Sequence, residues 1–194
     1  MDSAKGGKRS RNILPNLKEW LIKSGIASDI KIEPISDRHY EIKIQNSITH
    51  EYQNYADVGF GNSQVLPVLV SGFNLIEGGI FIVEQPEIHL HPRAQAELGD
   101  FFLQLYKKSI QSIIETHSEH LILRLQQHVI EGKINQNDIC FYYVHAEQDG
   151  KKITELRLDE NGKFNKDWPE GFFPERLVES KKIAQLRYNK VNKT

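Results

Sequence analysis

Apolar side chains recur with the 3.6-residue period of a helix in three parts of the chain. The first covers residues 17–26, the second begins at Pro92, a residue suited to a first helical turn, and the third follows Ser118, a good N-cap. Residues 56–79 contain a glycine-bearing loop and then a segment that is apolar almost all round, which predicts a buried helix ended by a Gly-Gly pair. The inward faces expected for the second and third helices carry Ala94, Leu98, Phe101, Phe102, Leu105, Leu121, Ile122, Leu125 and Val129.

Strand patterns separate these helices. Residues 30–35 and 39–45 alternate apolar and polar positions with a period of two, which predicts a β-hairpin or edge ribbon. The apolar runs at 79–84 and 112–116 are typical of strands that are buried on both faces of a parallel sheet. The last part of the chain, residues 138–159, predicts two strands joined by a Gln-Asp-Gly turn.

The middle of the chain therefore has the order strand, helix, strand, helix. This order predicts an α/β fold, with a mostly parallel central sheet flanked by helices and a small β-ribbon near the N-terminus. In such sheets ligands bind outside the carboxyl ends of the strands. Glu84 ends the first buried strand, and Thr116 and His117 end the second, so these residues are the first candidates for a functional site.

The composition fits one ordinary domain. The chain has 194 residues, of which 39% are hydrophobic and 26% charged, and no apolar run is long enough to span a bilayer. We expect a basic tail at residues 1–12, an ordered domain at 13–180 and a second basic tail at 181–194. The formal charge of -1 gives no global attraction to nucleic acid or anionic lipid. The single cysteine, Cys140, and the lack of a secretory signal favour a cytoplasmic protein without a disulfide framework or a Cys-based zinc cage.

The strongest chemical pattern is GIFIVEQPEIHLHPRAQ, at residues 79–95. A carboxylate at the tip of a buried strand, here Glu84, is a hard oxygen ligand of the kind that holds Mg²⁺ in nucleotide sites. His117, at the tip of the second strand, can donate a hydrogen bond to a phosphoryl oxygen that carries developing charge. The two tips together favour a site for the phosphates of a nucleotide.

These motifs resemble those of ABC-class ATPases of the AAA type, in particular the C-terminal half of the SMC-like and OLD-like bacterial group. EQPEIHLHP, with the strand before it, resembles the Walker B and D-loop segment, and IIETHSE resembles the H-loop. ADVGFGNSQVLPVL is similar to the degenerate signature loop and helix of that group, and WPEGFF, at residues 168–173, is similar to its C-terminal region. The motifs occur in the expected order, so the resemblance covers most of the predicted domain.

The resemblance implies a role for each matching position. Glu84 corresponds to the Walker B carboxylate that coordinates Mg²⁺, Gln85 occupies the position of the catalytic glutamate, and His117 that of the switch histidine. His91 falls at the usual D-loop aspartate. The signature positions, which would approach the γ-phosphate of a nucleotide bound by the opposite subunit, are Gly59, Gly61, Asn62 and Ser63.

The chain departs from the family pattern at three points. Gln85 cannot take a proton as a carboxylate can, so it would position water, or Glu87 would supply the missing base. Gly59 stands where the family commonly has a serine. The phosphate-binding pattern GxxxxGK[ST] does not occur in the sequence.

Without that loop the chain has no backbone cradle for the α- and β-phosphates. The resemblance then implies that a P-loop-bearing N-terminal half or partner chain completes the site, and that ATP and Mg²⁺ bind only in the completed site. ATP hydrolysis is expected only there. The same resemblance implies a head-to-head dimer and a DNA or bacterial-defence effector as further partners, with no membrane involved.

Two other functions are compatible with the sequence. Because the P-loop pattern is missing and Gln85 is not an acid, the fold could serve as a non-catalytic interaction or regulatory protein. His89 and His91, together with Glu84 and His117, could instead be the ligands of a mononuclear metal hydrolase. His128 is better explained as a core histidine, because it falls on the inward face of its predicted helix.

Overall fold

The computed structural model of the protein describes residues 13–147, 150–166, 182–186 and 188. The predicted tail at 1–12, residues 148–149 of the predicted turn, the WPEGFF segment and most of the predicted C-terminal tail lie outside the described residues. The chain divides into two compact units, one ending at Leu125 and the other starting at Gln126, and each is described here by itself. A single ordered domain over 13–180 stays a prediction.

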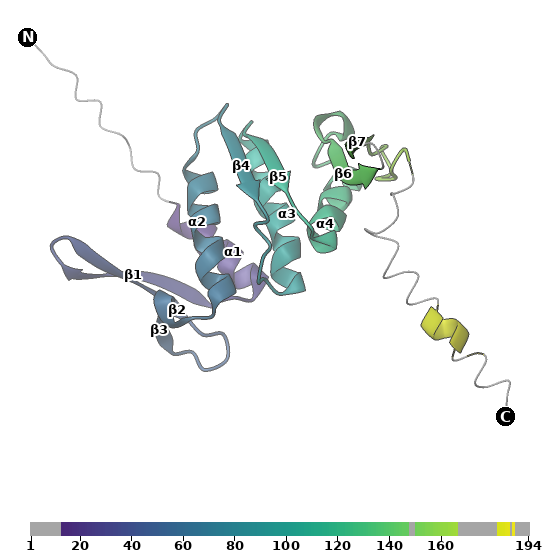
Figure 1. Cartoon of the computed structure of the whole chain (residues 1–194). Coiled ribbons are helices and arrows are strands. Elements are labelled where there is room, and N and C mark those ends of the chain that lie inside the picture. Colours follow the sequence, from purple (N-terminus) through teal and green to yellow (C-terminus); the bar gives the residue numbers. More distant parts are fainter. Residues whose placement is uncertain (1–12, 148–149, 167–181, 187, 189–194) are drawn as a thin grey trace, which may run out of the picture. The chain divides into compact units, whose positions relative to one another are not determined.

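Three helices of the first unit pack against one another (Figure 1). They are α1 (Leu14–Ser24), α2 (Phe60–Asn74) and α3 (Pro92–Lys107). α1 ends because Gly25 adopts a left-handed conformation, with a φ of 78°. α2 and α3 approach closely where α2 has Gly72, since a Cβ atom there would lie 2.4 Å from the Phe101 ring.

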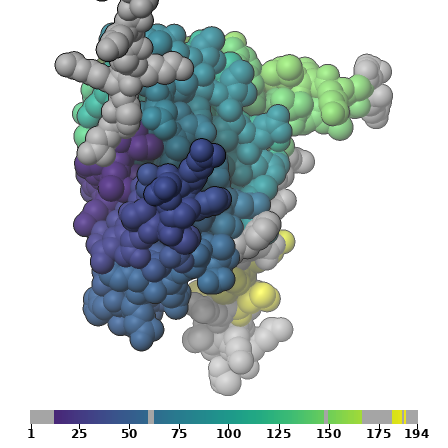
Figure 2. Space-filling model, turned by 90° about the vertical axis from the view of Figure 1, so that its left-hand side faces the viewer, coloured from purple at the N-terminus to yellow at the C-terminus, as the bar shows by residue number. Residues whose placement is uncertain are grey.

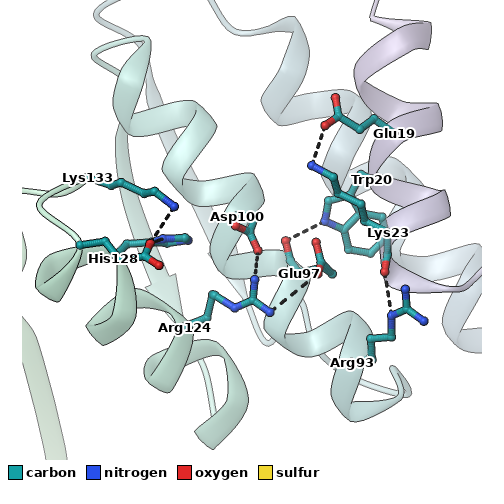
Figure 3. A network of polar contacts seen from close by, with 10 residues as sticks. Glu19, Trp20, Lys23, Arg93, Glu97, Asp100, Arg124, His128 and Lys133 are labelled. Carbon is teal, nitrogen blue, oxygen red and sulfur yellow. Dashed lines mark hydrogen bonds and ion pairs between the residues drawn. The ribbon is translucent and has the colours of Figure 1, made fainter.

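Polar contacts fix α1 against α3 and hold the start of α4 (Glu119–Ile130) beside α3 (Figure 3). The buried indole of Trp20 donates a hydrogen bond to the backbone carbonyl of Glu97 at 2.8 Å. Arg124 of α4 donates to Asp100 at 2.6 Å. Burial, with Asp100 nearby, raises the pKa of Glu97, and the Arg124 guanidinium opposes that rise.

A pair of parallel strands packs with one face against α3. β4 (Ile80–Glu84) pairs with β5 (Gln111–Glu115) in a register that sets Ile82 opposite Ile113 and Glu84 opposite Glu115. α3 connects the two strands, as the helix of a βαβ unit does. The predicted parallel strand pair at the centre of an α/β fold is therefore confirmed.

One cluster of aromatic rings forms the core between α3 and the strands. Phe101 is completely buried, and its ring centroid lies 5.1 Å from that of Phe73 on α2 and 5.8 Å from that of Phe81 on β4. The ring of Phe102 lies against two of these rings, with a centroid 5.1 Å from that of Phe101 and 6.3 Å from that of Phe81. These edge-on pairs stabilise the packing of helix on sheet beyond what apolar burial alone provides.

The predicted ribbon is a three-stranded antiparallel sheet of β1 (Asp29–Ser36), β2 (His39–Gln45) and β3 (Tyr52–Asn54), followed by a short 3-10 helix, η1 (Tyr55–Asp57). Because side chains alternate along a strand, its first two strands have a charged and an apolar face. The register places these residues on the apolar face: Ile30, Ile32, Pro34, Tyr40, Ile42 and Ile44. In Figure 2 the blue ribbon and the purple helix α1 lie next to each other.

Asp29 joins the ribbon to α1, and this contact makes stability depend on pH. Its carboxylate accepts a hydrogen bond from Lys18 at 2.8 Å and from the hydroxyl of Tyr52 at 2.6 Å, which lowers the pKa of Asp29 from 3.8 to about 2. A carboxyl group with a lower pKa in the folded protein than in the unfolded chain stabilises the fold at pH values above the unfolded pKa. This contribution to stability is lost as the pH falls from about 4 to about 2. When the pH is lowered from 5 to 2, the free energy of unfolding should fall further in wild type than in Asp29→Asn. We expect a difference of about 1 kcal/mol, after allowance for solvent screening.

Urea unfolding of both proteins at a series of pH values measures this difference. Asp37→Asn, at the exposed turn between β1 and β2, removes the same charge outside the contact and should follow the wild-type curve. Parallel curves for wild type and Asp29→Asn would contradict the prediction.

The second unit contains the predicted C-terminal pair of strands. β6 (Phe141–Glu147) and β7 (Gly150–Leu156) are antiparallel, and a 3-10 helix, η2 (Gln136–Asp138), precedes them. Gln126, in the second half of α4, donates to the carbonyl of Gly162 at 2.9 Å. His128 is 2% exposed, with Nδ1 lying 3.5 Å from the Glu131 carboxylate, so its predicted core position is confirmed.

The other helical predictions are confirmed at the level of single residues. Pro92 begins α3, and every residue expected on the inward faces of α3 and α4 is buried. Ser118 precedes α4, and its hydroxyl accepts a hydrogen bond from the N–H of Leu121 at 3.1 Å. Among the described residues, no helix combines the length and the hydropathy that crossing a bilayer requires.

Two predictions about burial and helix length are wrong. α2 ends at Asn74, before the Gly-Gly pair, because Leu75 is extended and its N–H bonds to the carbonyl of Gly72. Its outer face, which includes Pro67, is exposed. β4 and β5 are also exposed on one face, where Ile82 retains 68% of its accessible surface, because within the described part of the chain only the other face is covered.

Candidate functional site

The candidate site lies at the carboxyl ends of β4 and β5. The two strands end at the same level of the sheet, because their last residues, Glu84 and Glu115, are register partners. Both carboxylates are exposed and alternate with the buried side of their strands, so they project from the same face of the pair. The N–H of Gln85 bonds to the carbonyl of Glu115 at 2.8 Å and extends the ladder one residue beyond the strands.

This shared face carries three isoleucines and Gln111 before the two carboxylates, and we call it the open face. Its isoleucines are Ile80, Ile82 and Ile113, which are 58%, 68% and 52% exposed. Parallel strands are normally covered on both faces, so an open face of this kind is the most unusual feature of the first unit. The opposite face is covered by α3, through the contact of Phe81 with Phe101 and Phe102.

The turn after β4 connects the strand tip to α3. Gln85 and His89 both have left-handed backbone conformations, with φ of 45° and 62°, which are costly for residues other than glycine. Glu87 lies between them and is 6% exposed, and its Oε1 accepts a hydrogen bond from the N–H of His117 at 2.6 Å. A buried carboxylate in the turn after β4 therefore forms a hydrogen bond with the backbone of the turn after β5.

The turn after β5 is built by Thr116 and Ser118. The Thr116 hydroxyl accepts a hydrogen bond from the N–H of Ser118 at 3.0 Å. The Ser118 hydroxyl caps α4 and donates to Oε1 of Gln95 on α3 at 2.7 Å. His117 lies between these two residues with its side chain exposed. The backbone around the imidazole is thus held from both sides while the ring faces solvent.

The remaining predicted residues lie at helix N-termini. His91 is exposed, and its Nδ1 accepts a hydrogen bond from the N–H of Arg93 at 3.4 Å, so it caps α3. Gly59 is the exposed N-cap of α2, and Gly61, Asn62 and Ser63 belong to the first turn of that helix, not to a loop before it. α2 and β4 run in opposite directions (Figure 1), so these residues lie at the same end of the unit as Glu84.

The structure brings some of the predicted residues together and not others. Glu84 ends β4 as predicted, whereas β5 ends at Glu115, so the prediction that Thr116 and His117 end this strand is wrong. His117 lies in the turn after β5, where its backbone N–H reaches the turn that follows Glu84. The ligand set of the metal hydrolase is not formed: within the described residues, no group of three or more His, Cys, Asp or Glu side chains could hold a metal ion. The metal hydrolase therefore stays a hypothesis from the sequence, without a formed ligand set to support it.

Sequence reasoning missed two residues of the site. The strand pattern includes Glu115 without singling it out, although it ends its strand as Glu84 does and stands beside it. The sequence gives no sign of a role for Gln95, because its contact with Ser118 joins positions 23 residues apart. The position of Glu115 at a strand end could have identified it, whereas no local signal marks Gln95.

Solved structures of SMC ATPase heads share this fold. One comes from work on the structural biochemistry of ATP-driven dimerization and DNA-stimulated activation of SMC ATPases, with a TM-score of 0.54 and 13% identity over 74% of this chain and 83% of that chain. Another is the Smc head domain with an extended coiled coil, bound to the C-terminal domain of ScpA, derived from Pyrococcus furiosus; its TM-score is 0.55, with 14% identity over 75% of this chain. The match spans 34% of that second chain. The fold is therefore that of an ABC-class, SMC-like ATPase head.

The family match agrees with this class. Residues 8–122, more than half of the chain, match the model of the AAA ATPase domain, and the chain belongs to that family. Residues 134–182 match a second family, described as a protein of unknown function (DUF3696). No curated protein matches the chain. The predicted resemblance to SMC-like ATPases of the AAA type is confirmed, whereas its OLD-like part stays a prediction.

Proposed function

We propose that this chain supplies the Mg²⁺ ligand and a γ-phosphate contact to the ATP site of an SMC-like ATPase head, and that a P-loop-bearing segment completes the site. Glu84 would coordinate Mg²⁺, His117 would donate a hydrogen bond to the γ-phosphate, and Gln85 would orient the attacking water. Membership of the AAA ATPase family and the SMC-like fold support the proposal. The missing GxxxxGK[ST] pattern is the reason for a second segment, whether it lies on the same polypeptide or on a partner.

The open face is the observation that carries this proposal. Its three isoleucines would be buried by a strand-and-helix unit packed against β4 and β5, which is how parallel sheets bury their second face. Such a unit would end its own strand at the carboxyl end of the pair, where Glu84 projects. A phosphate-binding loop placed there would face the carboxylate across the nucleotide.

The chemistry of the strand ends fits a divalent cation. Glu84 and Glu115 are exposed carboxylates on adjacent strand ends, and two such groups repel each other unless a cation lies near them. Carboxylate oxygens are the ligands that Mg²⁺ prefers. When bound with ATP, Mg²⁺ neutralises charge on the phosphates. This chain's contribution would be to hold the carboxylate at the tip of a rigid strand.

The start of α2 supports a dimer in which ATP joins two heads. Gly59 has no side chain to cap α2, and the residue is exposed, so the N–H groups of the first turn can face a phosphate from outside. Gly61, Asn62 and Ser63 of one head would then meet a nucleotide held by the other, with His91 close to the contact. The solved SMC structure comes from work on ATP-driven dimerization and DNA-stimulated activation. A DNA or defence effector and a cytoplasmic location belong to the same proposal.

Substitution of the open face tests the central step. We expect Ile82→Asp to weaken association with a P-loop-bearing segment about 100-fold, because the new carboxylate would be buried without a partner. Ile35→Asp is the matched control, since both isoleucines lie on strands and are 68% exposed, but Ile35 belongs to the ribbon. Sedimentation of the mixed segments and binding of a fluorescent ATP analogue with Mg²⁺ measure the two effects.

Three outcomes of this experiment are informative. Association and nucleotide binding by wild type and Ile35→Asp, but not by Ile82→Asp, support the composite site. Equal association of all three proteins shows that the open face is not the contact. Nucleotide binding without turnover would favour the non-catalytic, regulatory alternative, to which the amide of Gln85 already points.

A further inference from the structure

The buried carboxylate of Glu87 calls for a physical explanation. Burying a carboxylate costs free energy unless hydrogen bonds replace its hydration. Glu87 is 6% exposed, and one of its oxygens accepts the short hydrogen bond from the N–H of His117. The other oxygen is also buried and has no hydrogen-bond partner among the described residues. The bond to His117 is thus the one interaction shown for this side chain that offsets its burial.

The N–H of His117 is a group that needs such an acceptor. It lies two residues beyond the end of β5 and directly before the N-cap of α4, so neither the sheet nor the helix supplies a backbone partner. A carboxylate gives a stronger and more directional bond than a neutral acceptor. The bond therefore fixes the backbone from which the exposed imidazole projects.

Three contacts join the two turns in consecutive order. The N–H of Gln85 bonds to Glu115, Glu87 accepts from His117, and Ser118 donates to Gln95. On one side the partners are Gln85 and Glu87 of the turn after β4 and Gln95 in the first turns of α3. On the other side they are the last residue of β5 and two residues of the turn that follows it. The strained conformations at Gln85 and His89 lie on either side of Glu87, which is where such contacts must hold the backbone against its local preference.

We infer that Glu87 is a positioning residue for His117, which sets the imidazole through its backbone N–H and couples it to the turn that follows Glu84. It acts neither on the nucleotide nor as the general base. The role assigned to the imidazole rests on the proposed function, whereas the coupling between the two turns does not. In the completed site, a displacement of the turn after β4 would move His117 with it.

Amide hydrogen exchange of the isotope-labelled 194-residue chain tests the coupling directly. We expect Glu87→Ala to speed exchange of the His117 amide about 10- to 100-fold, while the amides of Leu98 and Phe101 in α3 keep their wild-type rates. Glu87→Gln retains an oxygen that can accept the same bond, so it should exchange within about tenfold of wild type. Glu77→Ala removes an exposed glutamate from the turn before β4 and should change nothing.

Two results would overturn the inference. One is a His117 amide that exchanges at the wild-type rate in Glu87→Ala. The other applies if Glu87→Ala does not fold, and it is measured in Glu87→Gln. In that variant we expect the amide proton of His117 to move upfield, because a neutral acceptor replaces a carboxylate. An unchanged chemical shift in that variant would show that the bond is not formed.

Turnover by the completed head separates positioning from a merely structural role. Glu87→Ala should lower kcat and leave KM for ATP within about twofold, and should cause no further loss when combined with His117→Ala, because it acts through that residue. Additive losses would contradict a role through His117. If wild type does not bind ATP, only the proposed function is contradicted. The coupling of Glu87 to His117 is decided separately, by the exchange measurement on the isolated chain without nucleotide.

Discussion

Glu84→Gln should lower the Mg²⁺-dependent ATP turnover of the completed head about 100-fold or more, because the amide removes the charged ligand that the metal needs. The substitution keeps the size of the side chain, and Glu84 is exposed at the end of β4, so folding should be little affected. Steady-state hydrolysis at a series of Mg²⁺ concentrations measures the effect. Excess Mg²⁺ should restore part of the activity if the loss lies in metal binding.

Glu77→Gln is the control for Glu84→Gln. It removes the same charge from an exposed position in the turn before β4 and should hydrolyse ATP as wild type does. Glu115→Gln is a third variant, which tests whether the carboxylate opposite Glu84 in the register also takes part in binding the metal. Wild-type turnover by Glu84→Gln would show that the metal is held elsewhere.

Phe101→Ala should have the largest effect on stability. The ring is completely buried and contacts three other aromatic rings, on α2, β4 and α3 itself. Its removal leaves a cavity at the junction of these elements, which typically costs about 3–5 kcal/mol. Because small units are stabilised by only about 5–15 kcal/mol in total, we expect a large fall in Tm or loss of folding. Thermal unfolding followed by circular dichroism measures the change.

Two controls separate cavity formation from a general loss of apolar surface. Ile48→Ala removes an apolar side chain that is 88% exposed and should shift the unfolding free energy by less than about 0.5 kcal/mol. Phe101→Leu retains most of the buried volume and should cost less than Phe101→Ala. A Tm for Phe101→Ala equal to that of Ile48→Ala would mean that the aromatic cluster does not support the fold.

Most of the secondary structure could be predicted because its signals are local. The period of apolar residues in α3 identified its buried face residue by residue, and Pro92 and Ser118 marked where helices begin. The alternation in β1 and β2 predicted the antiparallel ribbon in the same way. These patterns depend on backbone geometry that repeats within a few residues, so distant parts of the chain do not alter them.

The candidate site could be predicted only in part. The sequence placed Glu84 and His117 at strand ends, and a parallel pairing then requires those ends to be neighbours. It assigned Glu87 only a possible catalytic role, because nothing in the order of residues shows that a side chain is buried. The sequence predicted a loop followed by a helix within 56–79 without marking the boundary, whereas the helix begins directly after Gly59 and includes Gly61, Asn62 and Ser63.

The sequence by itself determined the order and type of the elements, the inward faces of α3 and α4, and the position of Glu84 at a strand end, because each follows from short-range periodicity. The tertiary structure alone decided that Glu87 accepts from the N–H of His117, that Gln95 accepts from Ser118, and that three of the isoleucines of β4 and β5 lie on an open face. These features join residues 23 to 30 positions apart or depend on what covers a sheet. An apolar strand has the same sequence pattern whether or not another element covers it, so only packing in three dimensions distinguishes the two cases.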